Sequence, residues 1–171
     1  SNEEDNHAGL SSSLTHFYDV QHGGRGLASF ASSLQWSLAS MYTYALQQYG
    51  FAYGHRYLLS TLTAAEPGAR NVSAGRMFQT LGHLMHHVQD MGQPQHVRNE
   101  IHIHGAYFSQ AAAFFEMYTS RRLDPVLMQK LAAWPVVPVP AFSSASLYWT
   151  GGSSAYTGMA DVAGKNFPTY N

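Results

Sequence analysis

One stretch of sequence, HLMHHVQDMGQPQH at His83–His96, limits what this chain can fold into more than any other. Apolar residues run up to and through it at positions i, i+4, i+7 and i+11. They are Met77, Leu81, Leu84 and Val88. This spacing predicts an amphipathic helix whose apolar stripe faces the core. We expect the helix to start at an N-cap near Asn71 or Ser73 and to end near Gly92, because Pro94 biases its predecessor out of helix.

The polar side chains of the same helix suggest a metal site. His83, His86 and Asp90 lie at i, i+3 and i+7, roughly opposite the stripe. His86 and Asp90 project one turn apart, so an imidazole nitrogen and a carboxylate oxygen can share one ion at about 2.0–2.2 Å each. His96 follows after the helix, where the chain can fold a third ligand back. A solvated polar face is the commoner role for any single histidine, but the combination favours ligands.

Composition restricts the class of protein. With 171 residues the chain suits one domain, and we expect a single domain over 1–171. Charged residues are only 11% and apolar residues 45%, which indicates a globular chain rather than a disordered one. A net charge of −1 lacks the basic footprint of a nucleic-acid binder, so no stable nucleic-acid partner is expected. The absence of cysteine excludes disulfides, thiolate zinc sites and a cysteine nucleophile.

No stretch of the sequence predicts a membrane-spanning or targeting segment. None reaches the run of about 20 apolar residues that a membrane span needs. The first residues, SNEEDNHAGLSSSL, lack the basic and apolar regions of a signal peptide. We therefore expect neither a transmembrane segment nor a signal peptide in this chain.

The remaining patterns predict an all-α, compact multi-helix domain. Helices are expected at about 27–49, 52–65, 107–121 and 124–134. Gly50 suits the C-cap of the first, and Pro125 after Asp124 suits the start of the last. Residues 1–26 read as loop, and the chain after the last helix reads as a long Pro/Gly/Ser-rich C-terminal connection. Strand patterns and internal repeats are absent from the sequence.

Two segments carry a resemblance to a known family. The stretch LGHLMHHVQDMGQPQH contains His-x3-Asp-x5-His, with Pro two residues before the last His. It resembles the signature of the zinc-dependent phospholipase C superfamily, which also includes secreted single-strand-specific nucleases. Upstream, THFYDV resembles the family segment HFYDP, whose histidine is a ligand and corresponds to His16. The resemblance covers about residues 3–118 and implies the phospholipase C/nuclease-like helical fold and a secreted or cell-surface location.

The resemblance also implies a ligand set for two or three Zn²⁺ ions. The acidic cluster EED matches the place of a carboxylate ligand, for which Asp5 is preferred to Glu4, and FFEMY resembles a segment that ends in a ligating glutamate. By family analogy the ligands are Asp5, His16, His86, Asp90, His96, His102 and Glu116. Asp90 then bridges two ions. Asp5 also has a catalytic role, in which it orients or deprotonates the attacking water.

The chain departs from the family pattern at two places. Ala112 stands four residues before Glu116, where family members have a ligating histidine. We expect His102, or as second choice His104, to substitute for it. The family's N-terminal tryptophan and the histidine shortly after it have no match, so N-terminal residues of the family fold are expected to be missing.

The function implied by the resemblance is hydrolysis of a phosphodiester. Zinc with nitrogen and oxygen ligands lowers the pKa of bound water to about 7. We expect a monomeric, phospholipase C-like phosphodiester hydrolase that acts on a phospholipid head group or another phosphodiester and can contact membranes peripherally. The alternatives are a degenerate metal-binding helical domain without full catalysis, a single-strand nuclease or nucleotidase, and a histidine-rich bundle without a physiological metal.

Other residues have both a structural and a functional interpretation. The aromatic residues Phe17, Tyr18 and Trp36 are expected to pack in the core rather than line a substrate groove. His83 or His87 could donate a hydrogen bond to a metal ligand. Arg56 in GHRYLL is interpreted as part of an exposed polar edge rather than a phosphate clamp.

Overall fold

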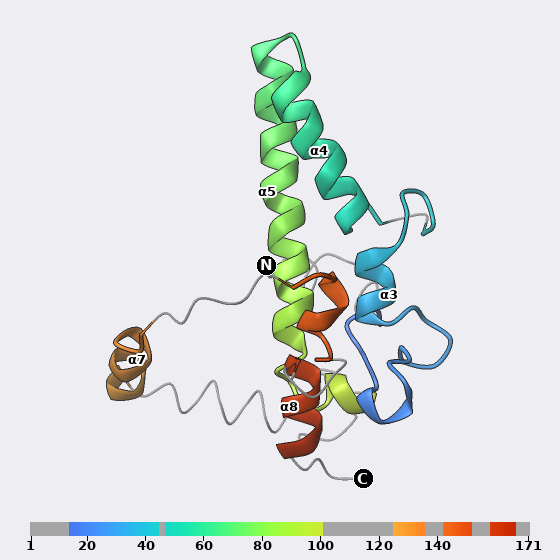
Figure 1. The fold of residues 1–171 in the computed structure, drawn as a ribbon, viewed down its shortest axis with the longest axis vertical. Helices are drawn as coiled ribbons and strands as arrows, with labels where there is room; N and C mark the ends of the chain where they lie inside the picture. The colour runs from blue at the N-terminus through green and yellow to red at the C-terminus, as the bar shows by residue number, and fades with distance from the viewer. Residues whose placement is uncertain (1–13, 45–46, 101–124, 136–141, 152–157, 167–171) are drawn as a thin grey trace, which may run out of the picture.

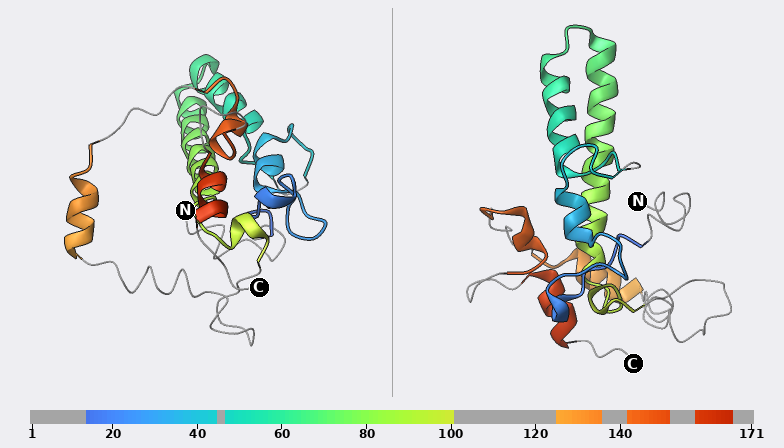
Figure 2. Two further views of the ribbon diagram at one scale, coloured as in Figure 1. Left: turned by 60° about the horizontal axis from the view of Figure 1, so that its bottom comes forward. Right: turned by 90° about the vertical axis from the view of Figure 1, so that its right-hand side faces the viewer.

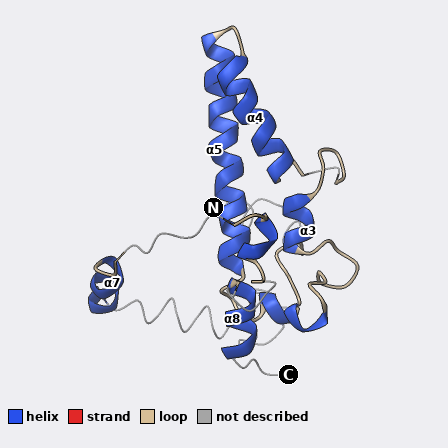
Figure 3. Ribbon diagram, viewed as in Figure 1, coloured by secondary structure: helices blue, strands red, loops and turns tan. Residues whose placement is uncertain are grey.

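The computed structural model describes residues 14–44, 47–100, 125–135, 142–151 and 158–166, and the structural statements below concern these residues. Their regular structure is helical throughout, with one isolated β-bridge between Asp19 and Arg25 (Figure 3). The α-helices are α3 (Ser33–Leu38), α4 (Phe51–Thr63), α5 (Pro67–Asp90), α7 (Pro125–Ala132) and α8 (Met159–Asn166), and the 3₁₀ helices are η1 (Val20–His22), η2 (His96–Arg98) and η3 (Ala145–Tyr148). The all-α class is therefore confirmed for this part of the chain.

Helices α4 and α5 form an antiparallel hairpin that rises above the other elements (Figures 1 and 2). The prediction of α4 is confirmed, but the predicted start of α5 near Asn71 or Ser73 is wrong. α5 begins at Pro67, because the first turn of a helix has no use for the N–H that proline lacks. Arg70 closes the connection by donating a hydrogen bond of 3.0 Å to the carbonyl of Ala64.

The prediction of one long helix at 27–49 is wrong, since α3 is the only helix among the residues of this range that the structure describes, 27–44 and 47–49. A capping box starts α3: the Ser32 hydroxyl accepts from the Gln35 amide at 3.3 Å, and the Ser32 amide donates to the Gln35 side chain at 3.0 Å. Positive φ angles at Ala28 (52°) and Tyr42 (69°) interrupt the helix on both sides. Gly50, expected to end this helix, is instead the N-cap of α4.

The hydrophobic core gathers segments that are far apart in the sequence. It lies where the end of α5 meets η1, η2, η3 and α8 (Figure 1). Its buried members are Tyr18, Met91, Val97, Trp149, Ala160 and Ala163. α8 was not predicted from the sequence. It packs closely against η1 because Gly164 has no Cβ; a Cβ there would lie 2.5 Å from Val20. The Arg98 guanidinium donates a hydrogen bond of 2.9 Å to the Gly164 carbonyl and so stabilises α8 in this position.

The buried face of α5 differs from the predicted stripe. Leu84 is buried as expected, but Leu81 is 49% exposed. The residues that α5 buries are Thr80, His83, Leu84 and His87. Histidines thus lie on the inner face of this helix rather than on a solvated one.

The other predictions have mixed outcomes. α7 begins at Pro125, as its sequence indicated, and lies apart from the other helices in Figure 1 and in the left view of Figure 2. The helix expected at 107–121 falls outside the described residues. Among the helices that the structure describes, none is long and apolar enough to cross a membrane.

Candidate metal centre

Four of the predicted ligands meet around the carboxylate at the end of α5. The Asp90 Oδ2 atom lies 2.8 Å from His16 Nδ1, 3.5 Å from His86 Nε2 and 3.6 Å from His96 Nδ1. His86 Nε2 and His16 Nδ1 are 3.3 Å apart, although 70 positions separate these residues in the sequence. Three separate segments of the chain therefore deliver polar side chains to one place.

Local structure explains how each segment arrives there. His86 and Asp90 are one turn apart on α5. A tight turn follows, in which Gln93 donates to the Asp90 carbonyl at 2.9 Å, and this turn leads directly into η2, where His96 is the first residue. The amide of Tyr18 donates to the His96 carbonyl at 2.9 Å, which aligns the segment containing His16 with η2.

The donor set fits a divalent metal ion. One ligand atom from each of His16, His86 and Asp90 lies within 4.8 Å of the other two. Two ligands of a tetrahedral zinc ion are about 3.4 Å apart, when each metal–ligand distance is near 2.1 Å. The distances of 3.3 and 3.5 Å from His86 to the other two residues agree with this, while the 2.8 Å between His16 and Asp90 is a hydrogen-bond length. Two imidazoles and a carboxylate suit several divalent transition metals and do not select zinc.

The electrostatics keep Asp90 ionised. Burial raises the pKa of its carboxyl group, but hydrogen bonds from His16 and His96, together with their charges, lower it by more. The pKa of Asp90 is therefore held well below its ordinary value of 3.8. At neutral pH the group is a carboxylate, which is the form that binds a cation.

A buried network of hydrogen bonds and ring contacts connects the cluster to the core. The Ser33 hydroxyl accepts a hydrogen bond of 3.1 Å from the indole N–H of Trp149 and lies 3.0 Å from Nδ1 of His87. The His87 ring stacks on Trp36, with centroids 4.5 Å apart, and contacts the ring of His16 at 4.8 Å. His87 thus connects the core to a predicted ligand, and Trp36 packs in the core as expected.

The neighbouring aromatic and histidine residues have structural positions. His83 is buried and stacks on Tyr49, with ring centroids 4.1 Å apart and planes 12° from parallel. Phe17 and Tyr18 are buried, as the core interpretation predicts, and the Phe17 ring lies 4.9 Å from that of His96. Phe17 therefore covers one side of the cluster.

Several predicted site residues cannot be placed. The catalytic and metal-binding candidate Asp5, the ligands His102 and Glu116, and the alternatives Glu4 and His104 lie outside the described residues. The same holds for Ala112. Their roles, and with them the second and third metal positions, remain predictions.

Comparison with known proteins gives no match to a family model, a curated protein or a solved structure. A functional assignment consequently depends on the geometry and chemistry of the cluster itself.

Proposed function

We propose that this protein is a zinc-dependent phosphodiester hydrolase of the phospholipase C/single-strand nuclease superfamily. The observation that carries the proposal is the convergence of His16, His86 and His96 on Asp90. One imidazole nitrogen of each lies within 3.6 Å of the same Asp90 carboxylate oxygen. These four residues match the ligand positions of the two motifs, which lie in distant parts of the sequence.

The residues of the cluster divide the work of holding an ion. His16, His86 and Asp90 would bind the first ion, and Asp90 also faces His96, the first ligand of a neighbouring one. A bound zinc ion supplies Lewis-acid chemistry, since it makes water more acidic and attracts phosphate oxygens. The His87 ring, which stacks on Trp36, packs against the His16 ring, and the Phe17 ring packs beside His96.

The proposal extends to substrate and location. The substrate is a phospholipid head group or another phosphodiester, bound by a monomer that is secreted or on the cell surface and contacts membranes peripherally. The low basic charge, with 9 Lys and Arg residues in 171, argues against a long polyanionic substrate. Single-stranded nucleic acid or a nucleotide is the alternative substrate.

A second candidate function is metal binding without full catalysis. The observation that favours it is Ala112, which stands where the family supplies a ligand histidine. A chain with one incomplete metal position can retain an ion at the other and still lack the second ion that hydrolysis requires.

Metal content and hydrolysis separate these functions. Protein purified without an affinity tag is analysed by mass spectrometry for zinc, then assayed on a chromogenic phosphocholine ester and on single-stranded DNA. We expect bound zinc and ester hydrolysis, both lost in His86→Ala. His55→Ala is the matched control, because His55 is an exposed histidine on α4 outside the cluster.

Each outcome distinguishes between the proposed functions. Zinc without hydrolysis of either substrate would support the non-catalytic function, and hydrolysis of DNA alone would support a nuclease. Protein that retains no divalent metal after incubation with zinc would contradict both functions.

A further inference from the structure

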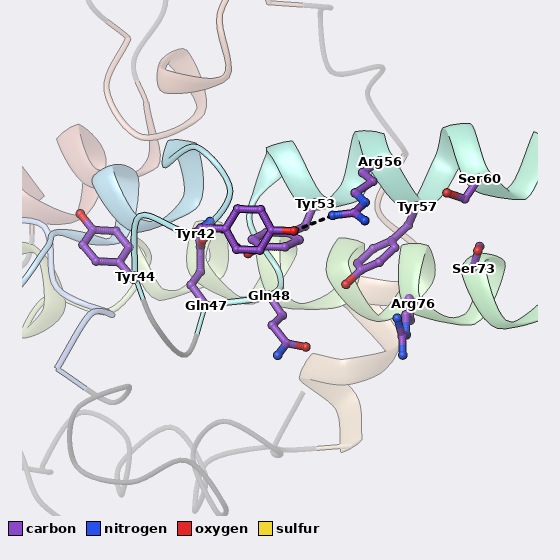
Figure 4. A pocket seen from close by; sticks show the side chains of 10 residues that line it. All are labelled: Tyr42, Tyr44, Gln47, Gln48, Tyr53, Arg56, Tyr57, Ser60, Ser73 and Arg76. Carbon is purple, nitrogen blue, oxygen red and sulfur yellow. Dashed lines mark hydrogen bonds between the residues drawn. The ribbon is translucent and has the colours of Figure 1, made fainter.

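A cavity lies between α4, α5 and the segment that precedes α4 (Figure 4). Its volume is about 420 Å³, within the size range of small-ligand sites. The side chains that define its chemistry are Tyr42, Tyr44, Tyr53, Tyr57, Arg56 and Arg76. No carboxylate of the described residues lines it. The cavity therefore combines aromatic walls with an excess of positive charge.

This cavity is separate from the candidate metal centre. It shares no residue with the cluster around Asp90. Arg76 and His86 lie ten residues apart on α5 (86 minus 76), which at roughly 1.5 Å per residue is about 15 Å. A ligand in the cavity would not touch the cluster unless it were long.

One wall of the cavity is built in advance. Tyr53 is 6% exposed, and its hydroxyl accepts a hydrogen bond of 3.1 Å from the amide of Tyr42. The two rings meet edge to face, with centroids 6.0 Å apart. Tyr42 has φ of 69°, a backbone conformation that costs energy in a residue other than glycine and is often found at functional sites. Tyr53 is thus held by burial, whereas Tyr42, 74% exposed, lies at the rim of the cavity and is positioned by its contacts with Tyr53 and Arg56.

Both guanidinium groups of the cavity are available to an anion. Arg56 donates a hydrogen bond of 2.9 Å to the Tyr42 hydroxyl, and its guanidinium is cationic at physiological pH. Arg76 lies over the ring of Tyr57, 5.8 Å from its centroid. Neither forms an ion pair with a carboxylate within the described part of the chain.

We propose that this cavity binds a small anion that carries a planar ring, of the class of aryl or heteroaryl phosphates and phosphonates. Arginine forks match the oxygens of such groups through paired charge-assisted hydrogen bonds. Tyrosine rings offer flat surfaces on which the ring of the ligand stacks. Arg56 is then part of a phosphate-binding site rather than a plain polar edge. This site does not depend on the proposed hydrolase function.

Calorimetric titration with phenylphosphonate tests the proposal. Its carbon–phosphorus bond resists phosphoester hydrolysis, so binding alone is measured. We expect a dissociation constant of about 1 mM or below, and binding about tenfold weaker for methylphosphonate, which lacks the ring, and for phenol, which lacks the charge. The His86→Ala variant, whose metal cluster is impaired, is expected to retain the binding that Arg56 and Arg76 provide, because the cavity shares no residue with the cluster.

Two pocket variants and one control locate the site. Arg76→Gln and Arg56→Gln are expected to weaken binding of phenylphosphonate about tenfold each. Arg70→Gln removes the same charge from α5 outside the cavity and is expected to change binding less than about twofold, because an exposed charge acts weakly over distance. In the wild-type protein, phenylphosphonate is expected to shift the ring-proton resonances of the tyrosines, a readout that does not depend on any variant folding.

Three results would overturn the proposal. The first is the absence of binding heat and of tyrosine shifts in the wild type. The second is an equal loss of affinity in Arg70→Gln and Arg76→Gln, which would indicate unspecific attraction. The third is loss of binding in His86→Ala with retention in Arg76→Gln, which would place the anion at the metal centre.

Discussion

Replacing Asp90 by Asn removes the charge around which three imidazoles gather and preserves the shape of the side chain. In the metal-free protein the main change is that the 2.8 Å hydrogen bond from His16 loses its charged acceptor, since bonds to charged groups contribute about 1.5–3 kcal/mol and bonds between neutral groups less. The contacts of 3.5 and 3.6 Å to His86 and His96 are longer than normal N–H···O bonds and contribute less. Because the Asn carbonyl still accepts from His16, we expect Asp90→Asn to lower the free energy of unfolding by about 1–2 kcal/mol.

With zinc bound, the same substitution should lower the free energy of unfolding by more. Loss of the anionic ligand is expected to lower zinc affinity at least about hundredfold, since removal of outer groups alone costs 10–100-fold. A hundredfold lower affinity removes about 2.7 kcal/mol of metal-dependent stabilisation at a fixed zinc concentration. The variant should therefore be destabilised by about 4 kcal/mol in total when both proteins are compared in excess zinc.

Urea unfolding in chelator and in excess zinc measures both quantities. Asp161→Asn serves as the control, because the Asp161 carboxylate accepts hydrogen bonds from the amides of Gly151 (2.8 Å) and Gly158 (3.2 Å) away from the cluster. The Asp161→Asn variant should show the same loss of unfolding free energy in chelator and in excess zinc, and it should retain its zinc. The reasoning would be refuted if Asp90→Asn behaved like Asp161→Asn in both respects.

Three further predictions concern the buried ring of His87, the capping box of α3 and the ionisation of Asp90. His87→Ala should lower the free energy of unfolding by about 2–4 kcal/mol, because it empties a buried space against Trp36, while mass spectrometry still finds zinc in the folded protein. Ser32→Ala should cost about 1 kcal/mol in chemical denaturation, because it breaks the capping box with Gln35, and Ser32→Thr should restore most of it. The pKa of Asp90 is lowered by folding, so its contribution to stability is complete above its unfolded pKa and is lost as pH falls towards its folded pKa. In chelator, the difference in unfolding free energy between wild type and Asp90→Asn should shrink as the pH falls below about pH 4; a difference that grew as the pH fell from about 4 would contradict the sign of the shift.

The helices that could be predicted from sequence are those whose ends are marked locally. Pro125 marks the start of α7, and Gly92 with Pro94 marks the end of α5. The prediction of a helix at 27–49 failed because regular apolar spacing was given more weight than a capping signal inside the segment. Ser32-x-x-Gln35 is such a signal, and it identifies the true start of α3.

The site was predictable only in part. Helical spacing places His86 beside Asp90, since that contact lies within one turn. The approach of His16 was expected only from a family motif, because 70 residues separate it from His86. The contact of Trp149 with Ser33 spans 116 residues and joins two neutral groups, which leave neither periodicity nor charge pattern in the sequence.

The burial of histidines on the inner face of α5 bears on why the cluster exists. His83 and His87 lie inside, where leucine would gain the free energy of apolar burial without the cost of desolvating an imidazole. Buried polar networks are often no better for stability than apolar residues of the same volume, so stability does not account for placing imidazoles there. His87 instead joins Trp36 to His16 and fixes the direction of the imidazole that meets Asp90. Binding energy from a metal ion would offset the desolvation cost of such an arrangement, because ion binding adds directly to folding free energy. The buried imidazole of His87 is thus what the proposed ion-binding site requires behind His16, in a group of side chains that could hold a metal ion.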